Sequence, residues 1–290
     1  MSETSSLIDG GAGHDLSVTM SPPPGISIRP REGEWWQLQQ RIIDRWIRRG
    51  LIGDLGGPVL KTDLFDEASG PHHHLKDLDP GILTIGMDWD LGVARAAQTR
   101  LAQAETTARL VVCDVRAIPF AASSLASALS LSTLDHFEST ESIVDSLSEL
   151  ARVLRAGGRL LLTLDNPWNP EVLLRAWLPS GIVRRLRADD FPLGRTMNLR
   201  QAERVFRDLH LEVMRKEYLM HSPRYLGIRM LNWLGRMQWH GVVRSMARLL
   251  ELLEVVSGSP LRSVTGHFIA WHLEKVAHPS RVDRPVVKGL

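Results

Sequence analysis

The sequence predicts a doubly wound α/β fold in which helices flank a mostly parallel sheet of seven strands. Three observations predict it: short, continuous apolar runs, helix-length segments between them, and acidic residues directly after several runs. Alternating strands and helices are typical of a parallel sheet whose ligands bind beyond the carboxyl ends of its strands. The acidic residues are therefore expected at the ligand-binding edge.

The composition limits the class of protein. The chain has 290 residues, 43% of them apolar, which suits one large domain or one domain with an appendage. Its 35 Lys and Arg residues nearly balance its 33 Asp and Glu residues, which disfavours a strongly basic nucleic-acid binder, and no apolar run of ~18 residues predicts a membrane span. The single cysteine, Cys113, excludes an intramolecular disulfide, and the opening residues MSETSS lack a secretion-signal pattern. A cytoplasmic location is expected.

The first part of the chain lies outside the predicted sheet. Residues 1–33 are polar and rich in Gly, Ser and Pro, which predicts a flexible arm. Residues 34–56 are expected to hold a helix, because apolar residues recur at helical spacing from Trp35 to Ile47 and Gly50 follows. The remaining segments are expected to be the α/β core (57–221), a helical lid (222–259), the last strand (260–276) and a tail (277–290).

The strands and helices of the core are predicted from apolar pattern. Helical spacing over 91–104 and 141–154, the second followed by a turn at Gly157-Gly158, predicts two helices of the core. The predicted strands are 59–60, 82–87, 110–113, 128–131, 160–164, 211–220 and 265–275.

A basic, helical segment separates the last two predicted strands. Residues 184–248 carry 14 Lys and Arg residues against 6 Asp and Glu residues, and 225–256 reads as a long helix broken near Gly227, Gly235 or Gly241. This segment could lie on a membrane surface, bind an anionic acceptor or form a lid with a solvated face. We expect a lid, because an insertion between those strands would hang over the ligand-binding edge.

The stretch from Leu110 to Pro167 carries a recognisable order of motifs. An apolar strand ends in Asp114, and Ala117-Ile118-Pro119-Phe120, a second strand, Thr133-Leu134-Asp135-His136-Phe137, a helix and a glycine turn follow before the next strand. This order resembles the class I S-adenosylmethionine-dependent methyltransferases, particularly the branch acting on small molecules and lipids. The resemblance covers roughly residues 57–275 and is specific over 110–167.

The resemblance implies S-adenosyl-L-methionine as cofactor and a set of residues that bind it. Asp88 would accept hydrogen bonds from the ribose hydroxyls, and Trp89 could stack on the adenine. Asp114 would accept from the adenine amino group, the backbone of Val115 would face the ring edge, and Ser132 is placed in the same site. Each acid could instead cap a helix or lie in a solvated turn, and Trp89 could simply cover the core.

The first loop departs from the family pattern. Family members have a glycine-rich turn after the first strand, whereas this chain reads Lys-Thr-Asp-Leu-Phe-Asp-Glu-Ala-Ser-Gly and keeps only Gly70. Thr62 and Asp63 stand where the first acid of the family does and could hold the ammonium and carboxylate of the cofactor, with Glu67 close by. The alternative is a degenerate site that has lost the cofactor.

Methyl transfer needs a positioned acceptor and, for oxygen or nitrogen acceptors, a group that takes up a proton. His136 is the candidate base, although it could equally hydrogen-bond within the fold. Asp165, Asn166, His221 and Tyr225 are the expected binding residues for a small-molecule acceptor. Oxygen, nitrogen and carbon acceptors all stay open.

Two other classes of function compete with this hypothesis. A catalytically silent relative would keep the fold as a binding or regulatory protein, and the weakened glycine turn favours it. A nicotinamide-dependent oxidoreductase would share the strand-end acid, but the chain has no Gly-x-Gly-x-x-Gly motif.

Three further features have simple interpretations. His72-His73-His74 read as a solvated loop and not as a metal site, and Asp189-Asp190 as a helix cap or local charge balance. No nucleic-acid partner is expected, because no recognition module accompanies the basic excess, although charge alone leaves tRNA open. The helix containing Trp35 and Trp36 could pack on its own chain or on a second copy, which leaves a homodimer open.

Overall fold

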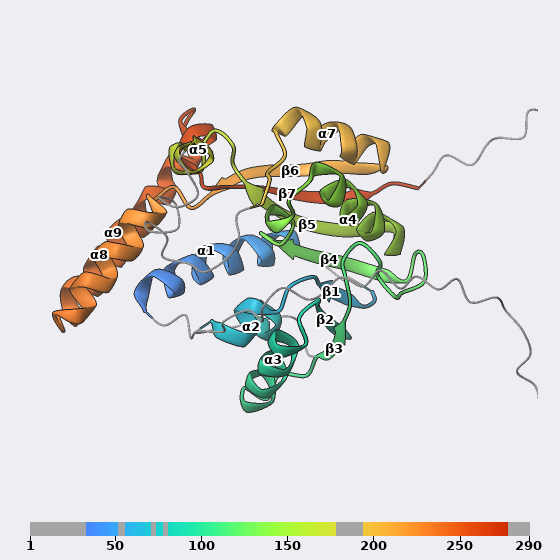
Figure 1. The fold of residues 1–290 in the computed structure, drawn as a ribbon, viewed down its shortest axis with the longest axis horizontal. Helices are drawn as coiled ribbons and strands as arrows, with labels where there is room; N and C mark the ends of the chain where they lie inside the picture. Colours follow the sequence, from blue (N-terminus) through green and yellow to red (C-terminus); the bar gives the residue numbers. More distant parts are fainter. Residues whose placement is uncertain (1–32, 52–55, 71–73, 78–80, 178–193, 278–290) are drawn as a thin grey trace, which may run out of the picture.

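The computed structural model describes residues 33–51, 56–70, 74–77, 81–177 and 194–277. They form a seven-stranded sheet in the order β3-β2-β1-β4-β5-β7-β6, with helices on both faces (Figure 1). This confirms the predicted doubly wound α/β fold. The strands are β1 (Val59–Lys61), β2 (Thr84–Asp88), β3 (Arg109–Val112), β4 (Leu125–Leu131), β5 (Leu154–Asp165), β6 (Leu211–Leu219) and β7 (Phe268–Lys275).

One strand runs against the other six. β7 pairs antiparallel with both β5 and β6, whereas the other neighbouring pairs are parallel. Phe268, the first residue of β7, is therefore opposite the last residues of its neighbours, Asp165 of β5 and Leu219 of β6. The insertion between β6 and β7 consequently starts and ends at the carboxyl edge of the parallel strands.

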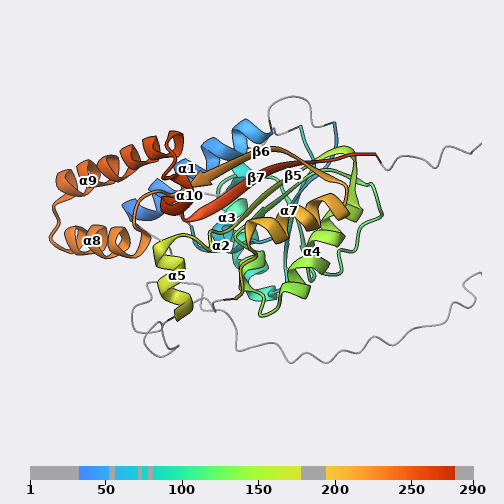
Figure 2. The ribbon, with the colours of Figure 1, turned by 90° about the horizontal axis from the view of Figure 1, so that it is seen from above.

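The helices divide between the two faces of the sheet (Figure 2). One apolar core packs α4 and α7 against the sheet, and the other packs α1, α8 and α9 against the opposite face. A third, smaller cluster joins α2 to α3. The helices are α1 (Glu34–Gly50), α2 (Phe65–Ser69), α3 (Leu91–Gln103), α4 (Thr140–Val153), α5 (Pro170–Trp177), α7 (Leu199–Asp208), α8 (Arg224–Arg236), α9 (His240–Leu252) and α10 (Arg262–Thr265), with 3-10 turns η1 (His74–Asp77), η2 (Leu134–His136) and η3 (Leu253–Gly258).

Two local predictions differ from the structure. The turn expected at Gly157-Gly158 lies inside β5, where the register with β4 shifts; Gly157 has φ +73°, a value that glycine adopts without strain. The long helical stretch breaks at residues 237–239, between α8 and α9.

Several predictions fall outside the described residues. They concern the flexible arm, apart from Gly33, the pair His72-His73, the pair Asp189-Asp190 and the tail beyond residue 277. Among the helices that the structure describes, none combines the length and the apolar character needed to cross a bilayer.

Candidate functional site

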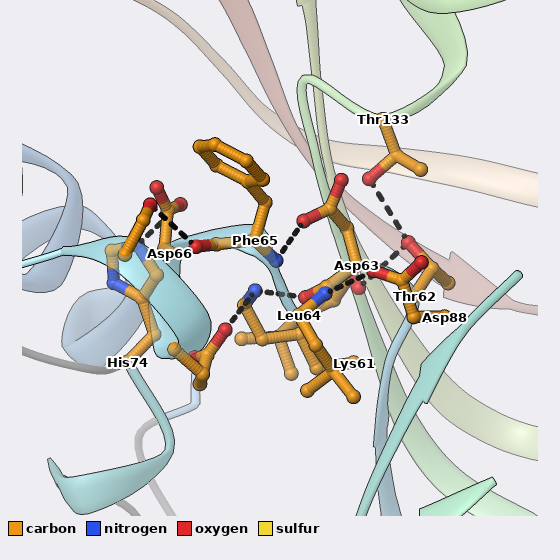
Figure 3. A network of polar contacts seen from close by, with 12 residues as sticks. Lys61, Thr62, Asp63, Leu64, Phe65, Asp66, His74, Asp88 and Thr133 are labelled. Atoms are coloured by element: carbon orange, nitrogen blue, oxygen red, sulfur yellow. Dashed lines mark hydrogen bonds and ion pairs between the residues drawn. The ribbon is translucent and has the colours of Figure 1, made fainter. Parts of the chain in front are cut away.

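The loop after β1 is built on a buried lysine. Lys61 ends the strand at the centre of the sheet, and its Nζ lies 2.7 Å from Oε2 of Glu67 and also donates to the backbone oxygen of Asp63 (Figure 3). Lys61 and Glu67 are 1% and 0% exposed. Burial alone would lower the pKa of Lys61, but Glu67, Asp63 and Asp66 together outweigh burial, so the pKa is raised and the ammonium stays charged. The buried pair thus fixes the loop where the family has its glycine turn.

Asp63 and Asp88 lie together at the ends of two adjacent strands. Asp63 accepts the N–H of Phe65 at 2.7 Å, and Asp88 accepts those of Leu64 at 3.0 Å and Asp90 at 2.9 Å. Burial, followed by repulsion from Asp63, raises the pKa of Asp88 to about 7, and burial is also the main cause of the raised pKa of Asp63. These two carboxyl groups therefore form an acidic pair beside the ammonium of Lys61, which lowers the pKa values of both.

Other predicted cofactor residues surround this pair. Trp89 follows Asp88 and leaves 48% of its surface exposed, so its indole can receive a stacked ring. Asp114 follows β3 and forms a bidentate ion pair with Arg116. Nη2 of Arg116 lies 2.6 Å from Oδ2 of Asp114, and Nε of Arg116 lies 3.0 Å from Oδ1. Burial opposes ionisation of Asp114, but the hydrogen bonds from Arg116 outweigh it and lower the pKa. Val115 is buried in the core beside α4.

The loop after β4 closes the site from the other side. Ser132 adopts φ +53° and donates its N–H to Oγ1 of Thr163 at 2.8 Å. Oγ1 of Thr62 lies 3.2 Å from Oγ1 of Thr133, which joins the loops after β1 and β4 (Figure 3). His136 belongs to η2, and its charge is close enough to lower the pKa of Asp63. The candidate base and the first-loop acid are therefore in the same site.

The predicted acceptor residues fall into two groups. Asp165 is buried at the end of β5, donates its N–H to Asp135 at 2.9 Å and places Oδ1 3.7 Å from Nε2 of His267. Asn166 is buried, and its amide donates to the backbone oxygens of Ser263 at 2.9 Å and Gly266 at 2.8 Å. Asp165 thus lies in a polar cluster, whereas the side chain of Asn166 holds the chain before β7 in place.

His221 and Tyr225 connect the insertion to the core. Nδ1 of His221 lies 2.8 Å from Oγ1 of Thr265 and Nε2 lies 3.0 Å from the backbone oxygen of Tyr218. Burial lowers the pKa of His221, so the neutral ring makes both bonds. The backbone N–H of Tyr225 donates to Glu171 at 3.2 Å, which ties α8 to α5.

Sequence reasoning missed four residues of this region. Lys61 is the first. The only indication in the sequence was its position directly after the two apolar residues of a predicted strand, Val59 and Leu60. Arg116 was missed although its partner Asp114 is only two residues away, whereas the contact of Asp135 with Asp165 is formed only by the fold. His267 is 2% exposed between Asp165 and Glu171, and in the sequence it was only one residue of a predicted strand.

His74 corrects the prediction of a solvated loop. It is 2% exposed, and its Nδ1 lies 2.6 Å from Asp44 of α1 while its Nε2 lies 3.4 Å from Asp66 of α2. Burial lowers its pKa, but hydrogen bonds to Asp44 and Asp66 outweigh burial and raise the pKa to about 9. Its two carboxylate partners make it an ion-paired link between α1 and the first loop. Within the described residues, no group of three or more His, Cys, Asp or Glu side chains gathers as metal ligands would.

The His74 link predicts a pH dependence of stability. A histidine whose pKa rises from 6.5 to about 9 on folding stabilises the native state fully below pH 6.5, and this contribution disappears as the pH rises through 9. We expect urea unfolding of the wild type to lose on the order of 3 kcal/mol relative to His74→Gln between pH 6 and pH 10. A constant difference between the two proteins over this range would contradict the buried ion pair.

Comparisons with known proteins agree with this geometry. Residues 66–162 match the family model described as a methyltransferase domain. An 85-residue segment is 32% identical to the mouse (Mus musculus) tRNA (carboxymethyluridine(34)-5-O)-methyltransferase ALKBH8, and this segment covers 29% of the chain but only 12% of that much longer protein.

Solved structures share the fold across most of the chain. A protein from Galdieria sulphuraria assigned as a sarcosine dimethylglycine methyltransferase has a TM-score of 0.55 at 12% identity, over 83% of this chain and 86% of its own. The geranyl diphosphate C-methyltransferase from Streptomyces coelicolor A3(2) has a TM-score of 0.50 at 16% identity, over 82% and 81%. The [4+2]-cyclase SpnF has a TM-score of 0.54 at 15% identity, over 81% of both chains. At these identities the likeness concerns the fold alone.

The sheet order, the strand-end acids and the family match define the class. Residues 66–162 of the chain match a methyltransferase domain, and they lie within a Rossmann-like fold. This match favours an S-adenosylmethionine-dependent methyltransferase over the nicotinamide-dependent alternative.

Proposed function

We propose that the protein transfers a methyl group from S-adenosylmethionine to a small or lipid-like acceptor. The main support is the placement of Asp63 and Asp88 at the ends of adjacent strands, with His136 close to Asp63. Asp88 and His136 lie inside the segment that matches the methyltransferase family model, residues 66–162, and Asp63 lies three residues before it.

The charge of this pocket fits the cofactor. Burial raises the pKa values of both Asp63 and Asp88, and repulsion from Asp63 raises that of Asp88 further, so a ligand that brings positive charge would stabilise the two carboxylates. Asp63 would face the ammonium, Asp88 would accept the ribose hydroxyls and the exposed indole of Trp89 would stack on the adenine. The cofactor supplies a methyl group already activated by a positively charged sulfur. The protein has then to align the acceptor, exclude water and take up a proton.

Exposed apolar side chains lie near the predicted acceptor residues. Trp168 is 64% exposed two residues after the buried Asn166, and Leu173 and Leu174 of α5 are also exposed. Exposed apolar groups next to buried polar groups suit an acceptor that has one polar, methylated end and an apolar body. This supports a small lipid-like metabolite over a highly charged polymer.

His136 is the proposed base for an oxygen or nitrogen acceptor. We expect His136→Ala to slow methyl transfer about 100-fold and to leave the affinity for S-adenosylhomocysteine within threefold, because proton uptake follows cofactor binding. The measurement is transfer of labelled methyl groups into a mixture of metabolites and lipids. His210→Asn, at the start of β6, is the matched control because asparagine tolerates the positive φ of that position. Equal label transfer by His136→Ala and the wild type would contradict the assignment.

A second candidate is a protein that binds the cofactor without turnover. It is favoured by two contacts that already occupy acceptor positions of the proposed cofactor-binding acids, the Asp114–Arg116 ion pair and the bond from the Leu64 N–H to Asp88. Calorimetric binding of S-adenosylhomocysteine together with no label transfer to any fraction of the mixture would select this candidate.

A further inference from the structure

Helices α8 and α9 form a hairpin that projects from the body of the protein (Figures 1 and 2). One apolar side of the hairpin is buried, because it packs against α1 and the sheet. Gly227 of α8 lies so close to the ring of Trp35 that any side chain at this position would collide with the ring. The buried residues of this inner side are Ile228, Leu231, Leu234, Val243, Ala247 and Leu250.

Each helix also carries a second apolar stripe that has no partner among the described residues. Leu226, Trp233 and Met237 recur at spacings of seven and four residues on α8, and Val242 and Leu249 recur at seven on α9. All five are between 46% and 64% exposed. A single exposed apolar residue would need no explanation, but repetition along one face of two adjacent helices indicates a contact surface.

Aromatic residues lie at the tip of the hairpin. Trp233 and Trp239 are 54% and 55% exposed, and their rings meet edge to face with centroids 6.5 Å apart. Tryptophan is enriched where protein meets the boundary between lipid and water, because the indole is apolar but carries one hydrogen-bond donor.

The charge of the hairpin is positive. Arg229, Arg236, Arg244 and Arg248 are all exposed. The one acidic residue between Arg224 and Leu252 is Glu251, whose carboxylate oxygens already bind Arg45 at 2.7 Å and Arg41 at 3.4 Å. No carboxylate of the hairpin is thus left to neutralise these four arginines.

A cavity at the junction of the hairpin with α1 adds to the positive surface. Its volume is about 580 Å³, and its lining includes Arg236, His240 and Arg244 together with one acid, Glu34, so the two arginines leave it with a net positive charge. A cationic hollow beside exposed apolar residues suits a phosphate-bearing head group whose chains lie against the apolar stripes.

We propose that the α8–α9 hairpin docks the protein onto the surface of an anionic lipid bilayer. The exposed stripes and the two tryptophans enter the boundary region, and the arginines contact lipid phosphates. A bilayer explains both the apolar stripes and the unneutralised charge, whereas a second copy of this basic hairpin would bring like charges together. The contact is peripheral and does not depend on methyl transfer.

The test is sedimentation of the full-length protein with vesicles. We expect binding to vesicles of phosphatidylglycerol and phosphatidylcholine in equal parts, weak binding to pure phosphatidylcholine, and release in 1 M salt. Arg229→Gln/Arg236→Gln should lower the partition coefficient about 30-fold, since each cation near such a surface contributes about 1 kcal/mol. Trp233→Ala/Trp239→Ala should lower it at least tenfold.

Two controls separate membrane docking from misfolding and from self-association. Met214→Ser changes an exposed apolar residue of β6, outside the hairpin, and should bind vesicles as the wild type does. Because all substituted side chains are exposed, thermal melting should be unchanged. Equal binding of both vesicle types, or no binding, would overturn the proposal. So would a concentration-dependent dimer that the tryptophan substitutions abolish while vesicle binding is unaffected.

Discussion

Replacing Lys61 by methionine should lower the free energy of unfolding by about 3–5 kcal/mol, because a buried carboxylate loses its counter-charge. The substitution removes the ammonium from Oε2 of Glu67, a side chain that is 0% exposed. A buried charge left without its partner costs this much, although the intact pair itself is not a large source of stability. Urea unfolding monitored by tryptophan fluorescence measures the effect.

The double variant Lys61→Met/Glu67→Leu is the matched control. It removes both charges and fills the space with apolar groups, so we expect it to recover most of the stability lost in the single variant. If Lys61→Met alone unfolds like the wild type, the ion pair beneath the first loop is not formed in solution.

Asp88→Ala should weaken S-adenosylhomocysteine binding at least 100-fold. The carboxylate is proposed to accept two ribose hydroxyls, and each hydrogen bond to a charged group contributes about 1.5–3 kcal/mol. Because the pKa of Asp88 is about 7, wild-type affinity should also fall as the pH drops from 8 to 6, and the variant should lose this dependence. Isothermal titration calorimetry at the two pH values measures both effects.

Asp90→Asn provides the comparison for Asp88. Asp90 caps α3 by accepting the N–H groups of Gly92 at 2.6 Å and Val93 at 3.0 Å, and asparagine can accept the same bonds. The control should bind like the wild type. Unchanged affinity in Asp88→Ala would remove the ribose role and with it the main argument for the cofactor pocket.

Much of the architecture could be predicted because it depends on local pattern. Continuous apolar runs marked β1 to β5, an alternating pattern marked β7, and helical spacing marked α1, α3 and α4. The placement of Asp88 and Asp114 at the carboxyl edge followed as well, since each acid stands at or just after the end of a parallel strand, although β3 is only partly buried. Element ends were less accurate, as the bulge at Gly157 shows, because strand pairing decides them.

The contacts of individual side chains could not be predicted in the same way. His74 read as part of a polar loop, because nothing in its neighbourhood along the chain shows that Asp44, thirty residues away, would pair with it. His267 pairs with acids from β5 and α5, and Asp135 accepts from β5. Such partners converge only once the sheet is assembled, so the fold must be known before the electrostatics of the site can be derived.

The reversed direction of β7 has an evolutionary consequence. Because Leu219 and Phe268 are paired neighbours, the whole segment between them leaves the sheet and returns to it at a single point. Deletion, lengthening or exchange of that segment would interrupt no strand, but the apolar surfaces of α1 and the sheet would need a new cover and Asn166 would need new hydrogen-bond partners. Exchange of residues 220–267 is therefore a route by which proteins with this sheet can change their surface and their substrate preference while all seven strands are retained.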